Sequence, residues 1–447
     1  MAKTDDLARR LAFEVLTRFE QTGSERLKAD SLIQEAISRH AQSLSDQDRG
    51  FIYALVMGTL RHWLRLDAWI LTLTQRKLKQ LTPPVRVLLR LGMFQLYGLS
   101  HVPAYAAINT TVNLAKGLKQ SPKTVGFINA VLREAQRRLE SNALTGPSAE
   151  ESLSQHLLWT YGWPEALTEQ LQQQASDIDL LSMAHSTEKP SSDLSIRVNT
   201  LQTNPEAYQT ILQEAGWSCK PFDAPLTEGL LVQDFSGSPR QLPGYEAGLF
   251  YIQDPASMWV SHVLGPQEGE HILDLCAAPG SKTTHMAALM QNQGRITALE
   301  PKPERLALLT ENLTRLGIQI VDTEQADALT WQPKEPGFLY DRVLVDAPCS
   351  GSGTLRKHPE ILLHLRKPNL SSFTQQQMAL LERGFANLKP GGTLVYSTCS
   401  ILPAENTELI ALFLAKTPQA RLDMQEQRLL SENADGFYAA RISKVES

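Results

Sequence analysis

Apolar residues recur at helical spacing through the first third of the chain, beginning at residues 7–16. An apolar residue at every third or fourth position is typical of amphipathic helices that pack around one core. Helix-start signals, either a Ser-Asp cluster or a proline in the first turn, stand at residues 45–48, 83–84 and 121–122. Strand patterns are absent here, so we predict a compact all-helical domain over residues 1–142.

The middle of the chain has a mixed pattern. Residues 141–148 carry Ser, Gly and Pro, a composition typical of a linker. A helical pattern follows at residues 164–174, then a short strand at residues 194–198, and then a further helix and strand. We predict a linker and a small α+β segment over residues 143–245.

The last part of the chain, residues 246–447, alternates short apolar runs with amphipathic stretches. This alternation predicts parallel strands joined by crossover helices, which is a doubly wound α/β sheet. The apolar runs are residues 271–275, 295–299, 318–321, 342–345 and 393–396. Ligands of such sheets bind beyond the carboxyl ends of the strands, and the chemically informative residues below fall at those ends.

Composition excludes several classes of protein. The chain has 447 residues, 42% of them hydrophobic, and no apolar run of about 18 residues that could span a membrane. Its start lacks the apolar stretch of a secretory signal. The four cysteines, Cys219, Cys276, Cys349 and Cys399, are far apart and form no C-x-x-C pair. We therefore expect no disulfide framework, no metal and a cytoplasmic location.

Charge is unevenly distributed along the chain. The net charge is -5, yet residues 51–140 hold thirteen Lys and Arg against three Asp and Glu. Such an asymmetry favours a helical domain that meets a polyanion, although solvated helix faces would give the same count. The candidate contacts to nucleic acid are Arg61, Arg65, Arg76, Lys77, Lys79, Arg86 and Lys119.

The first chemical motif is D-L-C-A-A-P-G-S-K-T-T at residues 274–284. It follows a predicted strand and opens a predicted helix, and its small residues let a ligand approach the backbone. It is neither G-x-G-x-x-G nor a Walker loop, which disfavours a phosphate site. An ordinary tight turn would have the same local sequence.

Acidic residues follow the next two strands. Glu300 can accept hydrogen bonds from both ribose hydroxyls of a nucleoside cofactor, and Asp327 can hold an adenine amino group. Each residue by itself is a weak indication of a cofactor site, because solvated carboxylates at strand ends are common. Their order after the turn at residues 274–284 favours a nucleoside cofactor.

Two cysteines stand at the ends of two further strands. Cys349 lies in D-A-P-C-S-G-S-G, residues 346–353, and Cys399 lies in S-T-C-S, residues 397–400. A cysteine at a strand end is usually an inert core residue. Because both strands belong to one sheet, we expect the two sulfurs to lie within about 10 Å of each other, the reach of one base.

Methylation of cytosine carbon 5 explains why a thiol would be needed. That carbon is a poor nucleophile until a thiolate adds to C6 and makes C5 part of an enamine. Asp346 could hydrogen-bond the pyrimidine edge, and a second thiol could assist release. The residues alone do not decide which cysteine attacks.

The three motifs, in this order and spacing, resemble the RNA 5-methylcytosine methyltransferases of the NOL1/NOP2/Sun group. The helical part, with runs such as Ala8-Arg9-Arg10 and Asn129-Ala130-Val131, resembles a NusB-like RNA-binding domain. The combination is similar to the bacterial Sun/Fmu subgroup. The resemblance implies a Rossmann-like class I methyltransferase domain, S-adenosyl-L-methionine as cofactor, and a single-stranded or loop cytosine of 16S small-subunit ribosomal RNA as substrate.

The resemblance also implies roles for individual residues. Cys399 would attack C6, Cys349 would help to release the product, and Asp346 would join them in catalysis. DNA cytosine methyltransferases use the cysteine of the P-C motif instead. Arg197 and Asp254 match family positions expected at the rim of the site. The implied cofactor contacts are Cys276, Ala277, Ala278, Pro279, Gly280, Lys282, Glu300, Arg305, Asp327 and Asp346.

One departure and three alternatives stay open. Leu362 and Leu363 stand where the family often has a basic residue and Trp, which puts local RNA contacts in doubt. The alternatives are a methyltransferase for tRNA or another ribosomal cytosine, a non-catalytic NusB-like RNA-binding factor, and a small-molecule methyltransferase. The last would leave the basic helical domain without a purpose.

Overall fold

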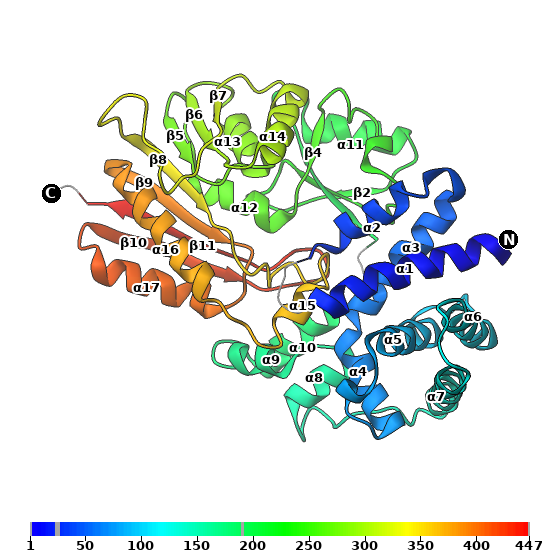
Figure 1. The fold of residues 1–447 in the computed structure, drawn as a ribbon. Helices are drawn as coiled ribbons and strands as arrows, with labels where there is room; N and C mark the ends of the chain where they lie inside the picture. Colours follow the sequence, from blue (N-terminus) through cyan, green and yellow to red (C-terminus); the bar gives the residue numbers. More distant parts are fainter. Residues whose placement is uncertain (1, 23–26, 189–191, 446–447) are drawn as a thin grey trace. The chain divides into compact units, whose positions relative to one another are not determined.

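The computed structural model describes residues 2–22, 27–188 and 192–445. It divides into two compact units (Figure 1). The first consists of residues 1–188 and 355–368, and the second of residues 189–354 and 369–447. The stretch 143–188, which we predicted to be a linker and part of an α+β segment, belongs to the first unit.

The first unit is all-helical, as predicted. No helix in the described part of the chain combines the length and apolar character needed to cross a membrane. The helices are α1 (Ala2–Thr22), α2 (Ala29–Ser38), α3 (Asp46–Arg61), α4 (Trp63–Thr74), α5 (Pro83–Gly98), α6 (Ala104–Gly117), α7 (Pro122–Glu140), α8 (Leu153–Tyr161), α9 (Glu165–Leu171), α10 (Asp177–Ser186) and α15 (Ile361–His364).

The helix starts follow the sequence signals. Ser45 and Asp48 form a reciprocal capping box at the start of α3. Ser121 caps α7, and prolines occupy the first turns of α5 and α7, where their missing N–H costs no helical bond. The apolar faces of α1 to α7 meet in one core.

An excursion of the chain completes this unit. Residues 355–368 leave the second unit and fold with the helices. Leu362 is 1% exposed, Leu363 packs against the helical core, and the Glu360 carboxylate accepts a 3.1 Å hydrogen bond from the Ala29 amide. The two leucines that depart from the family pattern are therefore anchors of this segment.

The second unit contains two sheets. The smaller is antiparallel, with strand order β2-β3-β1-β4, and α11 (Pro205–Glu214) packs on it. Its strands are β1 (Leu194–Val198), β2 (Cys219–Pro221), β3 (Gly229–Val232) and β4 (Phe250–Ile252).

The larger sheet has seven strands in the order β10-β11-β9-β8-β5-β6-β7. The five strands that we predicted are present and parallel, although β7 begins three residues later than expected. Two C-terminal strands that we did not predict, β10 and β11, extend the sheet in antiparallel fashion, so it is mixed. Its strands are β5 (His271–Asp274), β6 (Arg295–Leu299), β7 (Val321–Glu324), β8 (Tyr340–Asp346), β9 (Leu388–Thr398), β10 (Ala420–Arg428) and β11 (Phe437–Lys444).

Helices cover both faces of this sheet. Along β5, Ile272 packs with the cluster that contains α12 and α13, whereas its neighbour Leu273 packs with the cluster of α16 and α17. This alternation is the two-residue period of a strand buried on both faces. The helices are α12 (Pro255–Leu264), α13 (Ser281–Leu289), α14 (Pro303–Leu316), α16 (Ser371–Ala386) and α17 (Thr407–Lys416).

Candidate active site at the carboxyl edge of the sheet

The two strand-end cysteines meet. Strands β8 and β9 are parallel neighbours, with Asp346 opposite Ser397, so the loops after them emerge side by side. The Sγ atoms of Cys349 and Cys399 lie 3.3 Å apart, and no disulfide joins the two residues. The expectation that the sulfurs lie within about 10 Å is confirmed.

The surroundings of Cys349 favour its protonated form. A hydrogen bond with Cys399 and burial both raise the pKa of the Cys349 thiol well above its ordinary value, and the negative charge of Glu405 acts in the same direction. A thiol that keeps its proton can donate to its neighbour, whereas a thiolate is the form that attacks carbon.

Asp346 lies between two partners at the end of β8. One carboxylate oxygen is 2.8 Å from Nζ of Lys282, and the other accepts a 2.8 Å hydrogen bond from the Ser397 hydroxyl. Lys282 is buried, and its ammonium lies 4.9 Å from the centre of the Phe437 ring. Lys282 thus balances the charge of Asp346.

Sequence reasoning missed a buried carboxylate beneath both cysteine loops. Glu405, in the short helix η4 (Pro403–Glu405), is fully buried. It accepts hydrogen bonds from the Ser350 amide at 2.8 Å, from the Ser400 hydroxyl at 2.6 Å and from the Gln377 amide at 3.0 Å. The Ser350 hydroxyl also donates to it. The sequence offered one indication of this carboxylate, namely the serines of the motifs at residues 346–353 and 397–400. Their hydroxyls need a hydrogen-bond acceptor when they are buried.

Backbone bonds join the same two loops. The Gly353 amide donates to the Cys399 carbonyl at 2.9 Å, and the Gly436 amide donates to the Gly353 carbonyl at 2.8 Å. A Cβ at Gly353 would stand 1.9 Å from the Gly436 carbonyl oxygen, so only glycine permits this approach. The cysteine positions are therefore fixed by hydrogen bonds from several directions.

The turn after β5 has the predicted form. The buried Asp274 accepts the Thr283 hydroxyl at 2.7 Å and the Cys276 amide at 3.3 Å. Burial raises the pKa of Asp274 to about 6. Gly280, with φ +105°, opens α13 without a side-chain cap, and an added Cβ would press on Leu309. Ala277 and Ala278 are buried in this turn, followed by Pro279.

The acidic residues after β6 and β7 have different surroundings. Glu300 is 2% exposed, accepts the Lys302 amide at 3.0 Å and pairs with Arg305 at 3.3 Å. Arg305 also donates to the Ala278 carbonyl, so it links Glu300 to the turn after β5. Asp327 is exposed and accepts the Leu329 amide at 3.0 Å.

Arg197 and Asp254 were expected at the rim of the site, and for both this stays a prediction. Arg197 is buried, donates to the Ser281 carbonyl at 2.7 Å and to the Thr284 hydroxyl at 2.8 Å, and so holds the first turn of α13. Burial lowers the pKa of Arg197 to about 10. Asp254 caps α12 and accepts the Asp435 amide at 3.1 Å.

The basic residues proposed for RNA contact divide into two groups. Arg61, Arg65 and Arg86 are engaged within the helical unit, with Arg61 donating to the Thr187 carbonyl and Arg65 to the Tyr97 hydroxyl. Arg86 pairs with Glu20. Their guanidinium groups already have protein partners, so these three are weaker candidates, and their contact with RNA stays a prediction. The candidates that remain exposed are Arg76, Lys77, Lys79 and Lys119.

Comparison with known proteins gives matches over both parts of the chain. Residues 261–442 match the family model described as 16S rRNA methyltransferase RsmB/F, and residues 6–137 match the NusB family. The chain is similar, at 27% identity and a TM-score of 0.76, to the crystal structure of PH0851, with 98% of this chain and 99% of that one covered.

Curated relatives match over nearly the full length. A probable ribosomal RNA small subunit methyltransferase B of Synechocystis is 35% identical, covering 98% of this chain and 99% of its own. The ribosomal RNA small subunit methyltransferase B of Klebsiella pneumoniae is 34% identical, covering 90% and 92%. The chain therefore belongs to the RsmB/F family of ribosomal RNA methyltransferases, with a NusB-family helical region in its N-terminal part.

Proposed function

We propose that this chain, acting in the cytoplasm, transfers a methyl group from S-adenosyl-L-methionine to carbon 5 of a cytosine in 16S ribosomal RNA through a covalent adduct with Cys399. The observation that carries the proposal is the 3.3 Å separation of the Cys349 and Cys399 sulfurs at the ends of adjacent strands. Cysteines that only fill a hydrophobic core are surrounded by apolar side chains, whereas these two lie in loops held by hydrogen bonds to Glu405 and to backbone groups.

The reaction follows from the properties of the two thiols. The Cys399 thiolate adds to C6, which makes a C–S bond and leaves C5 electron-rich. After C5 has gained the methyl group, a water molecule takes the C5 proton, the electron pair of that C–H bond re-forms the C5–C6 double bond, and the C–S bond breaks with its electron pair on the Cys399 sulfur. The raised pKa of Cys349 keeps a proton on that thiol, which can be donated to the departing Cys399 sulfur. This supports Cys399 as nucleophile and Cys349 as the releasing group.

The cofactor would be held by the turn after β5 and the acidic ends of the next strands. S-adenosyl-L-methionine supplies an electrophilic methyl group. Gly280 opens α13 without a side-chain cap, and the carboxylates of Glu300 and Asp327 are acceptors suited to ribose hydroxyls and an adenine amino group. Arg305 would act by holding Glu300 and the turn together.

The target base would be single-stranded or swung out of its helix. A sulfur must approach the face of the pyrimidine ring, which stacking in a duplex blocks. Locking the target cytosine in a perfect duplex should therefore suppress methylation, and equal rates on duplex and loop substrates would contradict this.

Tritium transfer from labelled S-adenosyl-L-methionine tests the proposal. The full chain is incubated with unmodified 16S RNA, with tRNA and with free cytidine, and the products are digested to nucleosides. We expect label in 5-methylcytidine from 16S RNA. Label only in tRNA or free cytidine would reassign the substrate, and no label in any of them would favour a non-catalytic RNA-binding factor.

A further inference from the structure

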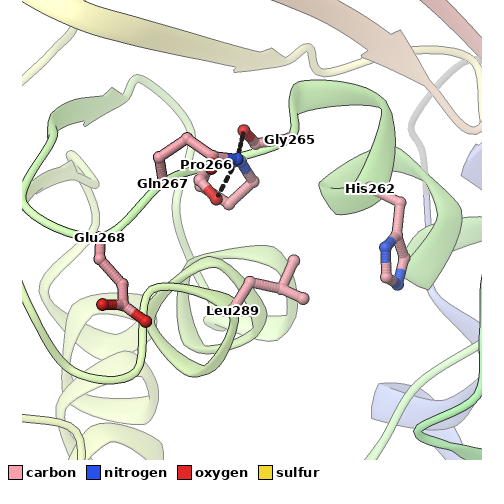
Figure 2. Close-up of a pocket in the computed structure, with 6 residues that line it drawn as sticks. All are labelled: His262, Gly265, Pro266, Gln267, Glu268 and Leu289. Atoms are coloured by element: carbon pink, nitrogen blue, oxygen red, sulfur yellow. Dashed lines mark hydrogen bonds between the residues drawn. The ribbon is translucent and has the colours of Figure 1, made fainter.

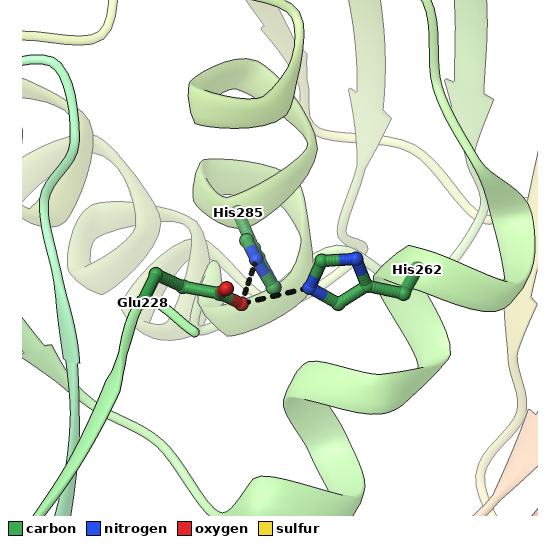
Figure 3. A group of neighbouring side chains, drawn as sticks. All are labelled: Glu228, His262 and His285. Atoms are coloured by element: carbon green, nitrogen blue, oxygen red, sulfur yellow. Dashed lines mark hydrogen bonds and ion pairs between the residues drawn. The ribbon is translucent and has the colours of Figure 1, made fainter. Parts of the chain in front are cut away.

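Three side chains from separate elements of the second unit converge beneath α13. Glu228 immediately precedes β3, His262 lies on α12, and His285 lies on α13 (Figure 3). Oε1 of Glu228 is 2.8 Å from Nε2 of His262 and 2.9 Å from Nε2 of His285. None of the three takes part in the reaction proposed above.

The imidazole of His285 is incompletely paired. It is 1% exposed, and its Nδ1 has no hydrogen-bond partner among the described residues. Its Nε2 lies 2.9 Å from Oε1 of Glu228, an oxygen that Nε2 of His262 also contacts at 2.8 Å, so the two rings share one oxygen. A buried imidazole nitrogen without a partner is destabilising, and a bound cation would remove that cost.

We propose that Glu228, His262 and His285 bind a divalent transition-metal ion of the zinc class. One carboxylate and two imidazoles are a set of three protein ligands that Zn²⁺ accepts, and imidazole disfavours Mg²⁺ and Ca²⁺. The three ligand atoms all lie within 4.8 Å of one another. Ligand atoms of a tetrahedral zinc lie roughly 3.3 Å apart, so small side-chain shifts would admit the ion.

A pocket borders His262, which is the proposed ligand that stays partly exposed (Figure 2). The volume of this pocket is about 460 Å³. The acidic Glu268 is on its wall and would attract a cation, and the pocket has room for a water molecule as the fourth ligand. Its lining residues are His262, Gly265, Pro266, Gln267, Glu268 and Leu289.

The ion would have a positioning role. His285 follows Lys282 by one helical turn on α13, and Lys282 pairs with Asp346 in the candidate active site. A metal bond from α13 to the residue before β3 would therefore fix the helix that carries part of that site. The sequence predicted no metal because its cysteine spacing was unsuitable, and no short motif joins these three ligands.

Metal content tests the proposal directly. Because the paired cysteines could also bind zinc, the parent protein for the test is the full chain with Cys349→Ala and Cys399→Ala. It is loaded with Zn²⁺, dialysed and analysed by mass spectrometry, and Co²⁺ loading is followed by visible absorption. We expect one equivalent of Zn²⁺ and the absorption of tetrahedral Co²⁺ with nitrogen and oxygen ligands.

Ligand variants in this parent locate the ion. Glu228→Gln and His262→Ala should each weaken Zn²⁺ binding by more than about 100-fold, since even outer-shell partners carry 10–100-fold. His271→Ala, in the same unit but outside the cluster, should bind as the parent does. Circular dichroism verifies that each variant folds. A parent that retains no Zn²⁺, or ligand variants that retain as much as the parent, would overturn the proposal.

Discussion

Single side chains decide the division of labour between the two thiols. Cys399→Ala removes the proposed nucleophile, so it should lose both methyl transfer and any covalent RNA complex. A serine there should do no better, because its hydroxyl is a far weaker nucleophile without a dedicated base. Cys349→Ala should still attack and transfer the methyl group but release the product slowly. The methylated RNA would then stay attached as a slow-migrating band on a denaturing gel.

The gel also distinguishes the alternative assignment. A band with Cys399→Ala and none with Cys349→Ala would make Cys349 the nucleophile, as in the DNA enzymes. Full activity in both variants would exclude a covalent mechanism. Binding of S-adenosyl-L-methionine serves as the control, and we expect it to survive both changes because the cofactor would rest on other residues.

Asp274 should make stability depend on pH. Burial raises its pKa from 3.8 to about 6 in the folded chain. The folded state therefore favours the protonated form of Asp274. The contribution of this group to the free energy of unfolding is fully present below about pH 4 and is lost as pH rises through 6. At 1.36 kcal/mol per pKa unit, the loss is about 3 kcal/mol.

Denaturant unfolding between pH 4 and pH 7 measures this effect. The stability of the native chain relative to Asp274→Asn should fall over that range, because the variant cannot ionise. Asp223→Asn, which changes an exposed carboxylate, is the control, and its free energy of unfolding should vary with pH as that of the native chain does. Parallel curves for Asp274→Asn as well would show that the Asp274 carboxyl is not perturbed.

At the scale of elements, the two cysteine loops are held by one carboxylate. Glu405→Gln exchanges one acceptor oxygen for an amide that faces the donors of Ser350, Ser400 and Gln377. An unmatched buried group of this kind costs about 1–3 kcal/mol. We expect a lower unfolding midpoint and a reduced kcat, with unchanged cofactor affinity. Glu408→Gln, on the exposed side of α17, is the matched control. Unaltered kcat in Glu405→Gln would limit Glu405 to a structural role.

The elements that sequence predicted are those with a local signature. The buried parallel strands are apolar runs, and the starts of α3, α5 and α7 carry capping residues or proline. Strand β10 was missed because it is polar and half-exposed, with Arg421 and Asp423 pairing on its surface. Its polar sequence is typical of a loop, and its strand conformation depends on pairing with β11.

The part of the candidate site that could be predicted consists of residues placed by the ends of neighbouring strands. Cys349 and Cys399 could be paired from topology, because adjacent parallel strands end at one edge. Glu405 and Arg197 could not be assigned, because charged residues are expected to be solvated and only the folded neighbours reveal their burial. The excursion of residues 355–368 depends on contacts distant in sequence, which no local pattern encodes.

At the scale of the whole molecule, positive charge is concentrated in the NusB-like unit while the chain is acidic overall. Cations that already have protein partners do not release counterions on binding RNA, so the exposed group should dominate. Replacing Arg76, Lys77, Lys79 and Lys119 by Gln should weaken RNA binding and flatten its salt dependence. Each lost contact should reduce the slope of log K against log salt by about 0.7–0.9.

Filter binding at several salt concentrations measures that slope, and two comparisons make it specific. Lys220→Gln with Lys416→Gln removes exposed positive charge from the second unit, and we expect the slope to stay near the native value. Binding of S-adenosyl-L-methionine should be equal in all variants, because a nucleoside cofactor in the second unit does not depend on the helical surface.

A quadruple variant with native RNA affinity and slope would show that the RNA is held elsewhere. If the control pair flattens the slope equally, the effect is one of net charge and not of a defined RNA surface. A loss confined to the quadruple variant would assign the electrostatic part of RNA binding to the NusB-like unit.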